Sequence, residues 1–355
     1  MTMYWSLLFI PMLAFLTPIK ASKDLSIIQW SIYWIFLTFV IGFRHEVGGD
    51  WFHYLNDNIV YNSMLGMEFL KIFTLSHLPH DIGFLFVHWF SQNLFNGIYT
   101  TNLVCAAIFT SGLLRLCRAT PAPWLALVIA TPFLITVVSM GYTRQSVALG
   151  FIMWGLVDLM NGEKSKYYLS IIAAVLFHKS ALIMILFGVF SKTRISNKIT
   201  KKDYIIISLI IVFVSAIYPN IEHMVYFYIT NTQMNSSGAL IRVSMSAAAA
   251  IVFFIFKKRW EIAYKDSNLW NLFSIFVLLL LPLVFVVSTA VDRIALYLLP
   301  MQIVIFTRAC VLITESNTRY FFIVGILFMY SLTLYIWLYY SVHSVLWLPY
   351  DNILL

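Results

Sequence analysis

The sequence contains few charged residues and no stretch polar enough to form a separate soluble domain. Of its 355 residues only 11% are charged, whereas 61% are hydrophobic. A soluble domain of this size does not need so apolar a sequence, and long apolar runs recur from one end to the other. The composition therefore predicts an all-α, polytopic integral membrane protein in which residues 1–355 form a single transmembrane domain.

Cysteine and metal-ligand patterns are also scarce. Cys105, Cys117 and Cys310 are an odd number, and each lies in or beside an apolar run, so we expect buried thiols rather than disulfides or a metal site. No D-x-D pair lies on a polar loop, and we therefore expect neither a metal nor another cofactor. The first twenty residues lack a basic start and a small-residue cleavage site, which favours a first membrane span over a removed signal peptide.

Apolar runs predict a series of regular membrane spans. They cover residues 3–19, 25–43, 97–117, 122–140, 146–160, 204–219, 240–256, 269–289, 294–313 and 320–340. Two further segments are irregular: residues 81–95 are short and polar in part, and residues 167–190 are interrupted in the middle by "HKS". In total we expect about 11–12 membrane helices, broken or re-entrant segments included.

The net charge of +8 fits cytoplasmic loops, which collect Lys and Arg, and does not require nucleic acid as a partner. All basic clusters can face the cytoplasm on two conditions. Residues 81–95 must be re-entrant or interfacial, and residues 167–190 must form a broken hairpin with "HKS" at its tip. A straight span at 167–190 is the other interpretation, but it would place a strongly basic loop outside. The hairpin predicts outward-facing (periplasmic) loops at 44–80 and 221–239, and cytoplasmic basic loops at 191–203 and 257–268.

Six cations then remain on the outer side or in the membrane near it, together with acidic groups and one imidazole. The cations are Arg44, Lys71, Arg144, Lys179, Arg242 and Arg293, and the other groups are Glu46, Asp50, His178 and Asp292. Charge near apolar helices is costly, so it usually faces a cavity or a partner. Their concentration on one side predicts an outward-facing pocket for a polyanionic, polar substrate.

The stretch "FRHEVGGDW" is the first polar motif. Arg44 offers a planar fork suited to phosphate, and Gly48 and Gly49 allow close backbone approach. Glu46 and Asp50 are candidates for a base or for partners of the arginine. An interfacial loop with a structural salt bridge explains the same residues. Farther along, Trp51 and Tyr54 follow at helical spacing and either stack on sugar rings or belong to an interfacial aromatic belt.

Two later motifs also suggest anion binding. In "GYTRQSVALG", Thr143 is expected to cap the following helix, and Arg144 in its first turn opposes the helix dipole unless an anion binds there or the side chain snorkels to headgroups. In "LFHKSAL", Ser180 is expected to cap a short half-helix whose amides, with Lys179, form an anion site. The alternative is a buried His178 that is hydrogen-bonded to the backbone.

The fourth motif is "STAVDRIALYLLP". It places Asp292 and Arg293 between two spans, with Tyr297 one turn later, and a local Asp–Arg pair at a turn is the other interpretation. Arg242 begins another span from the outside.

These four motifs, in this order, resemble those of a known family. "FRHEVGGDWFHY" is similar to the R-x-E-x-G-x-D-W/Y…Y signature of the EpsG-type branch of bacterial polysaccharide polymerases, which is similar to the Wzy O-antigen polymerases. "TRQSVALG", "LFHKSAL" and "DRIALYLLP" resemble the family's R-Q-x-x-A, F-H-x-S-A-L and R-x-x-x-Y elements. The resemblance covers about residues 40 to 300, most of the chain.

The resemblance implies a metal-independent glycosyltransferase with a fold related to the GT-C membrane enzymes. It would lie in the bacterial inner membrane, with its active site facing the periplasm, and join undecaprenyl-pyrophosphate-linked oligosaccharide repeats into O-antigen or a similar surface polysaccharide. The expected partners are those lipid-linked oligosaccharides, membrane lipids and, as a candidate, a chain-length regulator. The rival functions are a lipid-linked oligosaccharide flippase or other transporter, and a membrane acyltransferase that decorates polysaccharide.

The family supplies no catalytic assignment, so the roles come from the residues. Displacement of a lipid pyrophosphate needs cations, and we expect Arg44, Arg144 and Arg293, supported by Arg242 and Lys179. The candidates for the base are Asp50, His178 and Asp292. The candidates for other substrate contacts are Glu46, Gly48, Gly49, Trp51, Tyr54, Gln145, Ser180 and Tyr297.

Overall fold

The computed structural model describes residues 1–17, 23–62, 81–94, 97–191, 208, 236 and 238–354. Every regular element in these ranges is a helix, and one isolated β-bridge joins Arg44 to Asn352. In chain order the elements are α1 (Thr2–Leu16), α2 (Lys23–Gly42), α3 (Trp51–Asn62), α5 (Ile82–Leu94), α6 (Gly97–Arg118), α7 (Pro123–Ala130), η1 (Thr131–Val138), α8 (Ser139–Gly141), α9 (Thr143–Met160), α10 (Lys164–Phe177), η2 (Lys179–Met184), α11 (Ile185–Phe190), α13 (Ala239–Ala263), α14 (Ser267–Leu283), α15 (Ser288–Ala295), η4 (Leu296–Leu298), α16 (Pro300–Leu312), α17 (Ser316–Tyr340) and η5 (Val342–Leu346).

Several helices are long and apolar enough to cross a membrane. Five such helices lie in the described part of the chain, at Asp24–Gly42, Gly97–Arg118, Pro123–Gly141, Ala239–Ala263 and Ser316–Tyr340. A sixth candidate is the pair Ser288–Leu298 and Pro300–Leu312, which bends by 47° at its break. The prediction of an all-α, polytopic membrane protein is confirmed.

Pro123–Gly141 is the most buried of these spans and forms the centre of the bundle. Its middle part, η1, is wound as a π-helix. Pro132 lies at the start of this part and has no N–H for the helical ladder, which gives a reason for the wider turn. Because η1 and α8 pack against α9 and α17, this span positions the residues at the start of α9.

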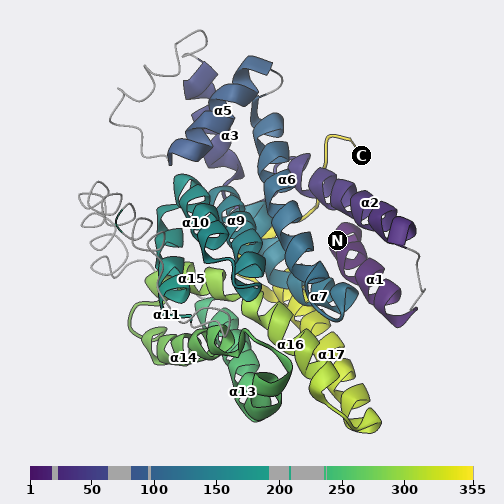
Figure 1. Cartoon of the computed structure of the whole chain (residues 1–355). Coiled ribbons are helices and arrows are strands. Elements are labelled where there is room, and N and C mark those ends of the chain that lie inside the picture. Colours follow the sequence, from purple (N-terminus) through teal and green to yellow (C-terminus); the bar gives the residue numbers. More distant parts are fainter. Residues whose placement is uncertain are drawn as a thin grey trace.

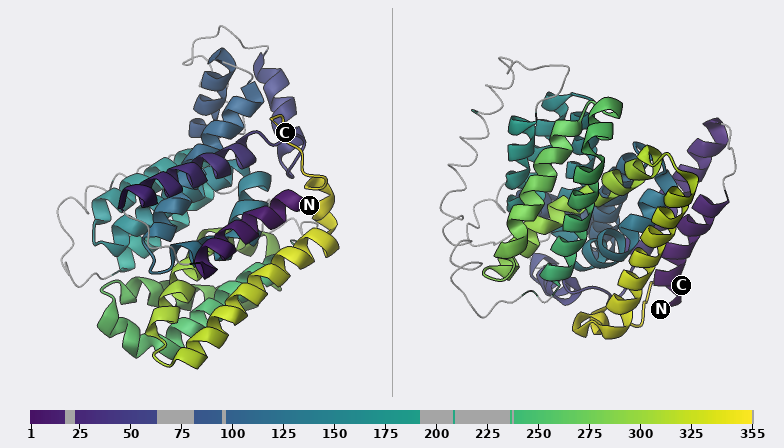
Figure 2. Two further views of the ribbon diagram at one scale, coloured as in Figure 1. Left: turned by 90° about the vertical axis from the view of Figure 1, so that its right-hand side faces the viewer. Right: turned by 90° about the horizontal axis from the view of Figure 1, so that it is seen from below.

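The remaining helices pack around this centre. Helix α9 lies between α6 and α10, α2 covers α6, and α13 packs against α14 and α16. Helices α3 and α5, with the first turns of α6, stand together at one end of the bundle (Figures 1 and 2). The two termini are close, because the Tyr4 hydroxyl donates to the Trp347 carbonyl at 2.7 Å.

Residues 164–190 form the expected broken hairpin. Helix α10 ends where His178 adopts an extended backbone conformation, and the chain then returns as η2 and α11. The hydroxyl of Tyr167, near the start of α10, donates to the carbonyl of Met184 at 2.6 Å. Gly188 packs against the same tyrosine, so the two ends of the segment lie at the same level and "HKS" forms the tip.

Other segments differ in detail from the expected boundaries. The segment predicted as re-entrant or interfacial is α5, which packs on α6 and α10 and stands at one end of the bundle (Figure 2). The choice between re-entrant and interfacial stays a prediction. The expected loop 257–268 is mostly helix, because α13 continues to Ala263 and α14 begins at Ser267. Part of the expected loop 44–80 is α3. The predicted span at 204–219, apart from residue 208, and most of the loops 191–203 and 221–239 lie outside the described residues.

Candidate functional site

A small cavity of about 80 Å³ lies where four of the predicted motifs meet. Its seven lining residues all carry polar side chains: Asp50, Tyr54, Tyr142, Arg144, Gln145, His178 and Arg293. They come from the start of α3, the start of α9, the tip of the 164–190 hairpin and α15. The volume exceeds the roughly 10–15 Å³ that one water needs, so the cavity has room for a small anionic group. We call it the cation cavity, because Arg144 and Arg293 both line it.

Arg144 is held in place by a chain of polar contacts. Its Nε donates to the Tyr54 hydroxyl at 3.2 Å, and that hydroxyl donates to Oδ2 of Asp50 at 3.0 Å. On its other side, Nη1 of Arg144 lies 3.8 Å from the carboxylate of Asp81. Arg144 lies in the first turn of α9, as predicted. These carboxylates offset part of the unfavourable interaction between the arginine and the helix dipole.

Burial changes the pKa of both Asp50 and Asp81. Burial raises the pKa of Asp50, while the Tyr54 hydroxyl and the nearby arginines counteract the increase. Burial also raises the pKa of Asp81 to about 6, against the opposing effects of Arg144 and Lys179. A carboxylate whose pKa moves towards neutrality is a better general base near neutral pH than an ordinary one.

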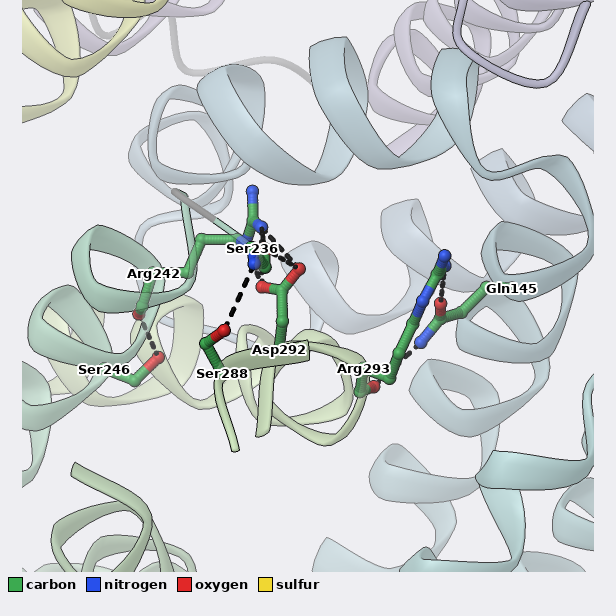
Figure 3. A network of polar contacts seen from close by, with 7 residues as sticks. All are labelled: Gln145, Ser236, Arg242, Ser246, Ser288, Asp292 and Arg293. Carbon is green, nitrogen blue, oxygen red and sulfur yellow. Dashed lines mark hydrogen bonds and ion pairs between the residues drawn. The ribbon is translucent and has the colours of Figure 1, made fainter. Parts of the chain in front are cut away.

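Arg293 reaches the cation cavity from α15. Its Nη1 donates to Oε1 of Gln145 at 3.2 Å, and Nε2 of Gln145 donates back to the Arg293 carbonyl at 2.9 Å. Figure 3 shows this reciprocal pair. The guanidinium also lies 4.9 Å from the ring centre of Tyr142. Gln145 therefore fixes the direction of the arginine, and because it also lines the cavity its predicted substrate contact stays a prediction.

His178 lines the cation cavity through a ring held by two hydroxyls. Nδ1 lies 2.6 Å from the Ser180 hydroxyl and 3.3 Å from that of Tyr297. The two hydroxyls are 3.1 Å apart. Ser180 does not cap the following helix as expected, because its hydroxyl is bonded to these groups, and Tyr297 is fully buried. Both residues orient the imidazole and do not line the cavity.

Asp292 and Arg242 form a buried ion pair beside the cation cavity. Nε and Nη2 of Arg242 donate to the two carboxylate oxygens of Asp292, each at 2.6 Å. Ser236 donates to the same carboxylate at 2.8 Å (Figure 3). Neighbouring residues of α15 thus point to different partners, Asp292 to Arg242 and Arg293 to Gln145. The alternative interpretation, a local Asp292–Arg293 pair, is not what the structure shows. Both oxygens of Asp292 accept from Arg242, which favours a structural role for this carboxylate. Arg242 also lines a second, larger cavity, and its predicted pyrophosphate role stays a prediction.

Arg44 lies outside the cation cavity and is 1% exposed. Its guanidinium donates to the carbonyls of Ile41 at 2.6 Å and Val47 at 3.0 Å, and to the Thr143 hydroxyl at 2.9 Å. Thr143 therefore accepts from Arg44 instead of capping α9. Because these acceptors are internal, the geometry favours a structural role for Arg44 rather than pyrophosphate contact.

Gly48 and Gly49 have different surroundings and different roles. Gly48 has φ +107°, and a Cβ there would lie 1.9 Å from the carbonyl oxygen of Met140. The glycine therefore allows the loop to approach the backbone at Met140 closely, whereas close approach of a substrate was expected from the sequence. Gly49 has no such contact and lines a second cavity, described below.

The C-terminal tail holds the loop that carries Asp50. Gly48 N donates to the Leu346 carbonyl at 2.8 Å, His45 N to the Asp351 carbonyl at 3.0 Å, and Ile353 N to the Phe43 carbonyl at 3.1 Å. The tail had no predicted role, since these are backbone contacts that no sequence motif specifies.

The other predicted contacts lie away from the cavity. Glu46 has a 59% exposed side chain and lies 4.0 Å from His45. Trp51 is 2% exposed and packs against the rings of His45 and Tyr99. Lys179 does not line the cation cavity, and its backbone N–H bonds to Asp81. Tyr54, by contrast, lines the cavity, with its hydroxyl between Asp50 and Arg144.

Sequence reasoning missed two features. Asp81 had no predicted role, although an aspartate immediately before an apolar helix is a recognisable signal. It joins Arg144 to the tip of the hairpin. The second feature is a larger cavity of about 490 Å³, which Asp50 and Tyr142 also line. Its other walls come from η1, α13, α17 and η5, and no single motif marks it.

Membrane-length helices and a buried cavity with two arginines and a carboxylate define a polytopic membrane protein with a candidate anion-binding site. The chain belongs to the EpsG family, whose family model matches residues 27–352. The predicted family is confirmed, and membership indicates a polysaccharide polymerase-like glycosyltransferase. No curated protein and no solved structure was found to match the chain, so the expected relation to GT-C enzymes stays a prediction.

Proposed function

We propose that this protein is a polysaccharide polymerase that joins undecaprenyl-pyrophosphate-linked oligosaccharide repeats into O-antigen or a similar surface polysaccharide. The observation that carries the proposal is the convergence of Arg144, Arg293 and Asp50 in one cavity. The family supports the general reaction, and the cavity supplies groups suited to its charge changes. The proposed setting is the bacterial inner membrane with the cavity facing the periplasm, and the positive-inside distribution of the basic clusters supports this orientation.

The arginines are proposed to bind the pyrophosphate of the donor lipid. Negative charge develops on this group as its bond to the anomeric carbon breaks, and positioned cations stabilise that charge. Gln145 directs Arg293, and Tyr54 with Asp81 directs Arg144. The charges needed for the leaving group are thus supplied by the protein's own side chains.

Asp50 is proposed as the general base. The acceptor hydroxyl oxygen attacks the anomeric carbon, its proton passes to the Asp50 carboxylate, and the electrons of the broken bond leave with the pyrophosphate. Asp50 lines the cation cavity and has a pKa raised by burial. Asp292, in contrast, has both of its oxygens bonded to Arg242.

His178 is proposed as a donor to the pyrophosphate rather than as the base. A hydroxyl proton from Ser180 or Tyr297 donated to Nδ1 makes that nitrogen the acceptor of a neutral ring. The other nitrogen, Nε2, then carries the proton and donates. Ser180 and Tyr297 are proposed to hold the ring in this tautomer.

Purified protein and one synthetic lipid-linked repeat test the proposal. The polymerase produces a ladder of lengthening products on a gel. A transporter or an acyltransferase leaves single repeats, so a clean absence of any ladder from folded, membrane-inserted protein contradicts the proposal. Asp50→Asn should abolish the ladder while keeping donor binding, whereas wild-type turnover in this variant would remove Asp50 as the base.

A further inference from the structure

The larger cavity adjoins the cation cavity and has no assigned occupant. Both cavities are lined by Asp50 and Tyr142. A group in the larger cavity therefore lies within reach of the same carboxylate that we propose as the base. We infer that the larger cavity binds the non-reducing end of the acceptor saccharide, an inference that rests on the proposed function.

The size and lining of the larger cavity suit a saccharide. Its volume of about 490 Å³ lies in the range of about 300–1,000 Å³ that is usual for sites of small organic ligands. Aromatic rings of Tyr142, Trp337 and Tyr340 line it together with the imidazoles of His53 and His343. Sugar rings have apolar faces that pack on aromatic rings and hydroxyls at their edges that bond to polar side chains.

The position of the cavity completes the geometry of the transfer. With the acceptor here and the donor pyrophosphate beside Arg144 and Arg293, the attacking hydroxyl and the leaving group occupy two adjoining cavities that Asp50 lines in common. The new bond joins the acceptor oxygen to the anomeric carbon, the hydroxyl proton goes to Asp50, and the bond to pyrophosphate breaks with its electron pair.

A polyprenyl chain is the competing occupant, since Phe133, Val137 and Ile336 also line the cavity. Hydrocarbon packed against Asp50 would exclude water from the part of the carboxylate that the Tyr54 hydroxyl does not bond, which costs free energy. A saccharide supplies hydroxyls at this position. The cavity also lies at the end of α17, where η5 and the polar residues Ser341 and His343 close it.

Two synthetic probes separate the acceptor from the donor. The acceptor probe is the repeat oligosaccharide as an alkyl glycoside, which has no pyrophosphate and cannot donate. The donor probe is the lipid-pyrophosphate-linked repeat without its accepting hydroxyl, which cannot accept. Coupling of the two by purified protein gives a KM for each probe.

The variants are Trp337→Ala and Tyr340→Ala, with Tyr339→Ala as the matched control. Tyr340 is 70% exposed, so its replacement does not endanger folding, and Tyr339 is the neighbouring aromatic residue, 50% exposed, outside the cavity lining. We expect each cavity variant to raise the acceptor KM by about tenfold, the scale of one lost ring contact, while the donor KM and the control stay at wild-type values.

The outcomes separate this inference from the proposed function. If the wild-type protein couples the probes and the cavity variants keep the wild-type acceptor KM, the acceptor site is wrong and the polymerase stands. An increase confined to the donor KM assigns the cavity to the polyprenyl chain and likewise overturns the inference. If the wild-type protein couples nothing, the proposed function itself fails.

Discussion

Arg144→Gln tests the cation cavity most directly. The change removes a guanidinium that lines the cavity and retains a side chain able to form hydrogen bonds. Loss of one positioned donor to a developing charge costs about 2–4 kcal/mol of transition-state stabilisation, which corresponds to about a 30- to 1,000-fold decrease in turnover. The side chain is 30% exposed and lies 3.8 Å from Asp81, so the contact contributes only about 0–1 kcal/mol to folding stability.

Arg115→Gln is the matched control. Arg115 is 29% exposed, pairs with the carboxylate of Asp158, and lies 4.2 Å from the ring centre of Trp154. It does not line the cation cavity, and it lies 13 residues, or about 20 Å, along α6 from Asn102, which contacts Arg44.

The assay is the ladder made by purified protein, with turnover divided by the amount of folded protein from size-exclusion chromatography. We expect a severe decrease for Arg144→Gln and near wild-type turnover for Arg115→Gln. If Arg144→Gln kept wild-type turnover, or if both variants lost it equally, the cation cavity would not be the pyrophosphate site.

Three further predictions concern the surroundings of the cavity. Arg44→Ala should lower the yield and melting temperature of the protein, because four buried neutral acceptors lose a charged donor, at a cost of about 1–3 kcal/mol for each that stays unsatisfied; unchanged melting would contradict the structural role. Gly48→Ala should be similarly damaging, whereas Gly49→Ala should fold normally, since only Gly48 has a positive φ and a Cβ clash; equal melting temperatures would refute this distinction. Wild-type turnover should decrease as pH falls through about 6, because protonation of Asp81, whose pKa burial raises to about 6, removes the charge that holds Arg144. Asp81→Asn should remove this contribution and leave only the pH dependence of Asp50. The raised pKa means that the folded state binds this proton more tightly than the unfolded state, so the Asp81 contribution to stability increases as pH falls through the same range, and melting curves would separate loss of activity from unfolding. A pH profile that is identical in wild type and Asp81→Asn would rule out this role.

The sequence predicted the fold class because membrane helices need long apolar runs, which are local and easily counted. It also predicted the broken hairpin, since the basic residues after 190 and the "HKS" interruption together constrained the path of the chain. The family was recognised from four short motifs, and the match to residues 27–352 confirms it.

The roles of individual arginines could not be predicted from the sequence as well as the fold class could. Arg44 and Arg144 both follow apolar runs in motifs with similar neighbours, yet one is enclosed by internal acceptors and the other lines a cavity. Pairing across the bundle also joined Arg242 to Asp292, 50 residues apart. A sequence motif shows which side chains are present near a site but not which partners they meet.

The sequence by itself determined that this is a helical membrane protein of the EpsG family and that its cations gather in a few motifs. Only the tertiary structure decided which of these cations share the cavity with Asp50 and His178, and which are used within the fold. The reason is physical: helix formation and membrane insertion depend on local apolarity, whereas the direction of each side chain depends on contacts between distant helices and on the C-terminal tail that holds the Asp50 loop.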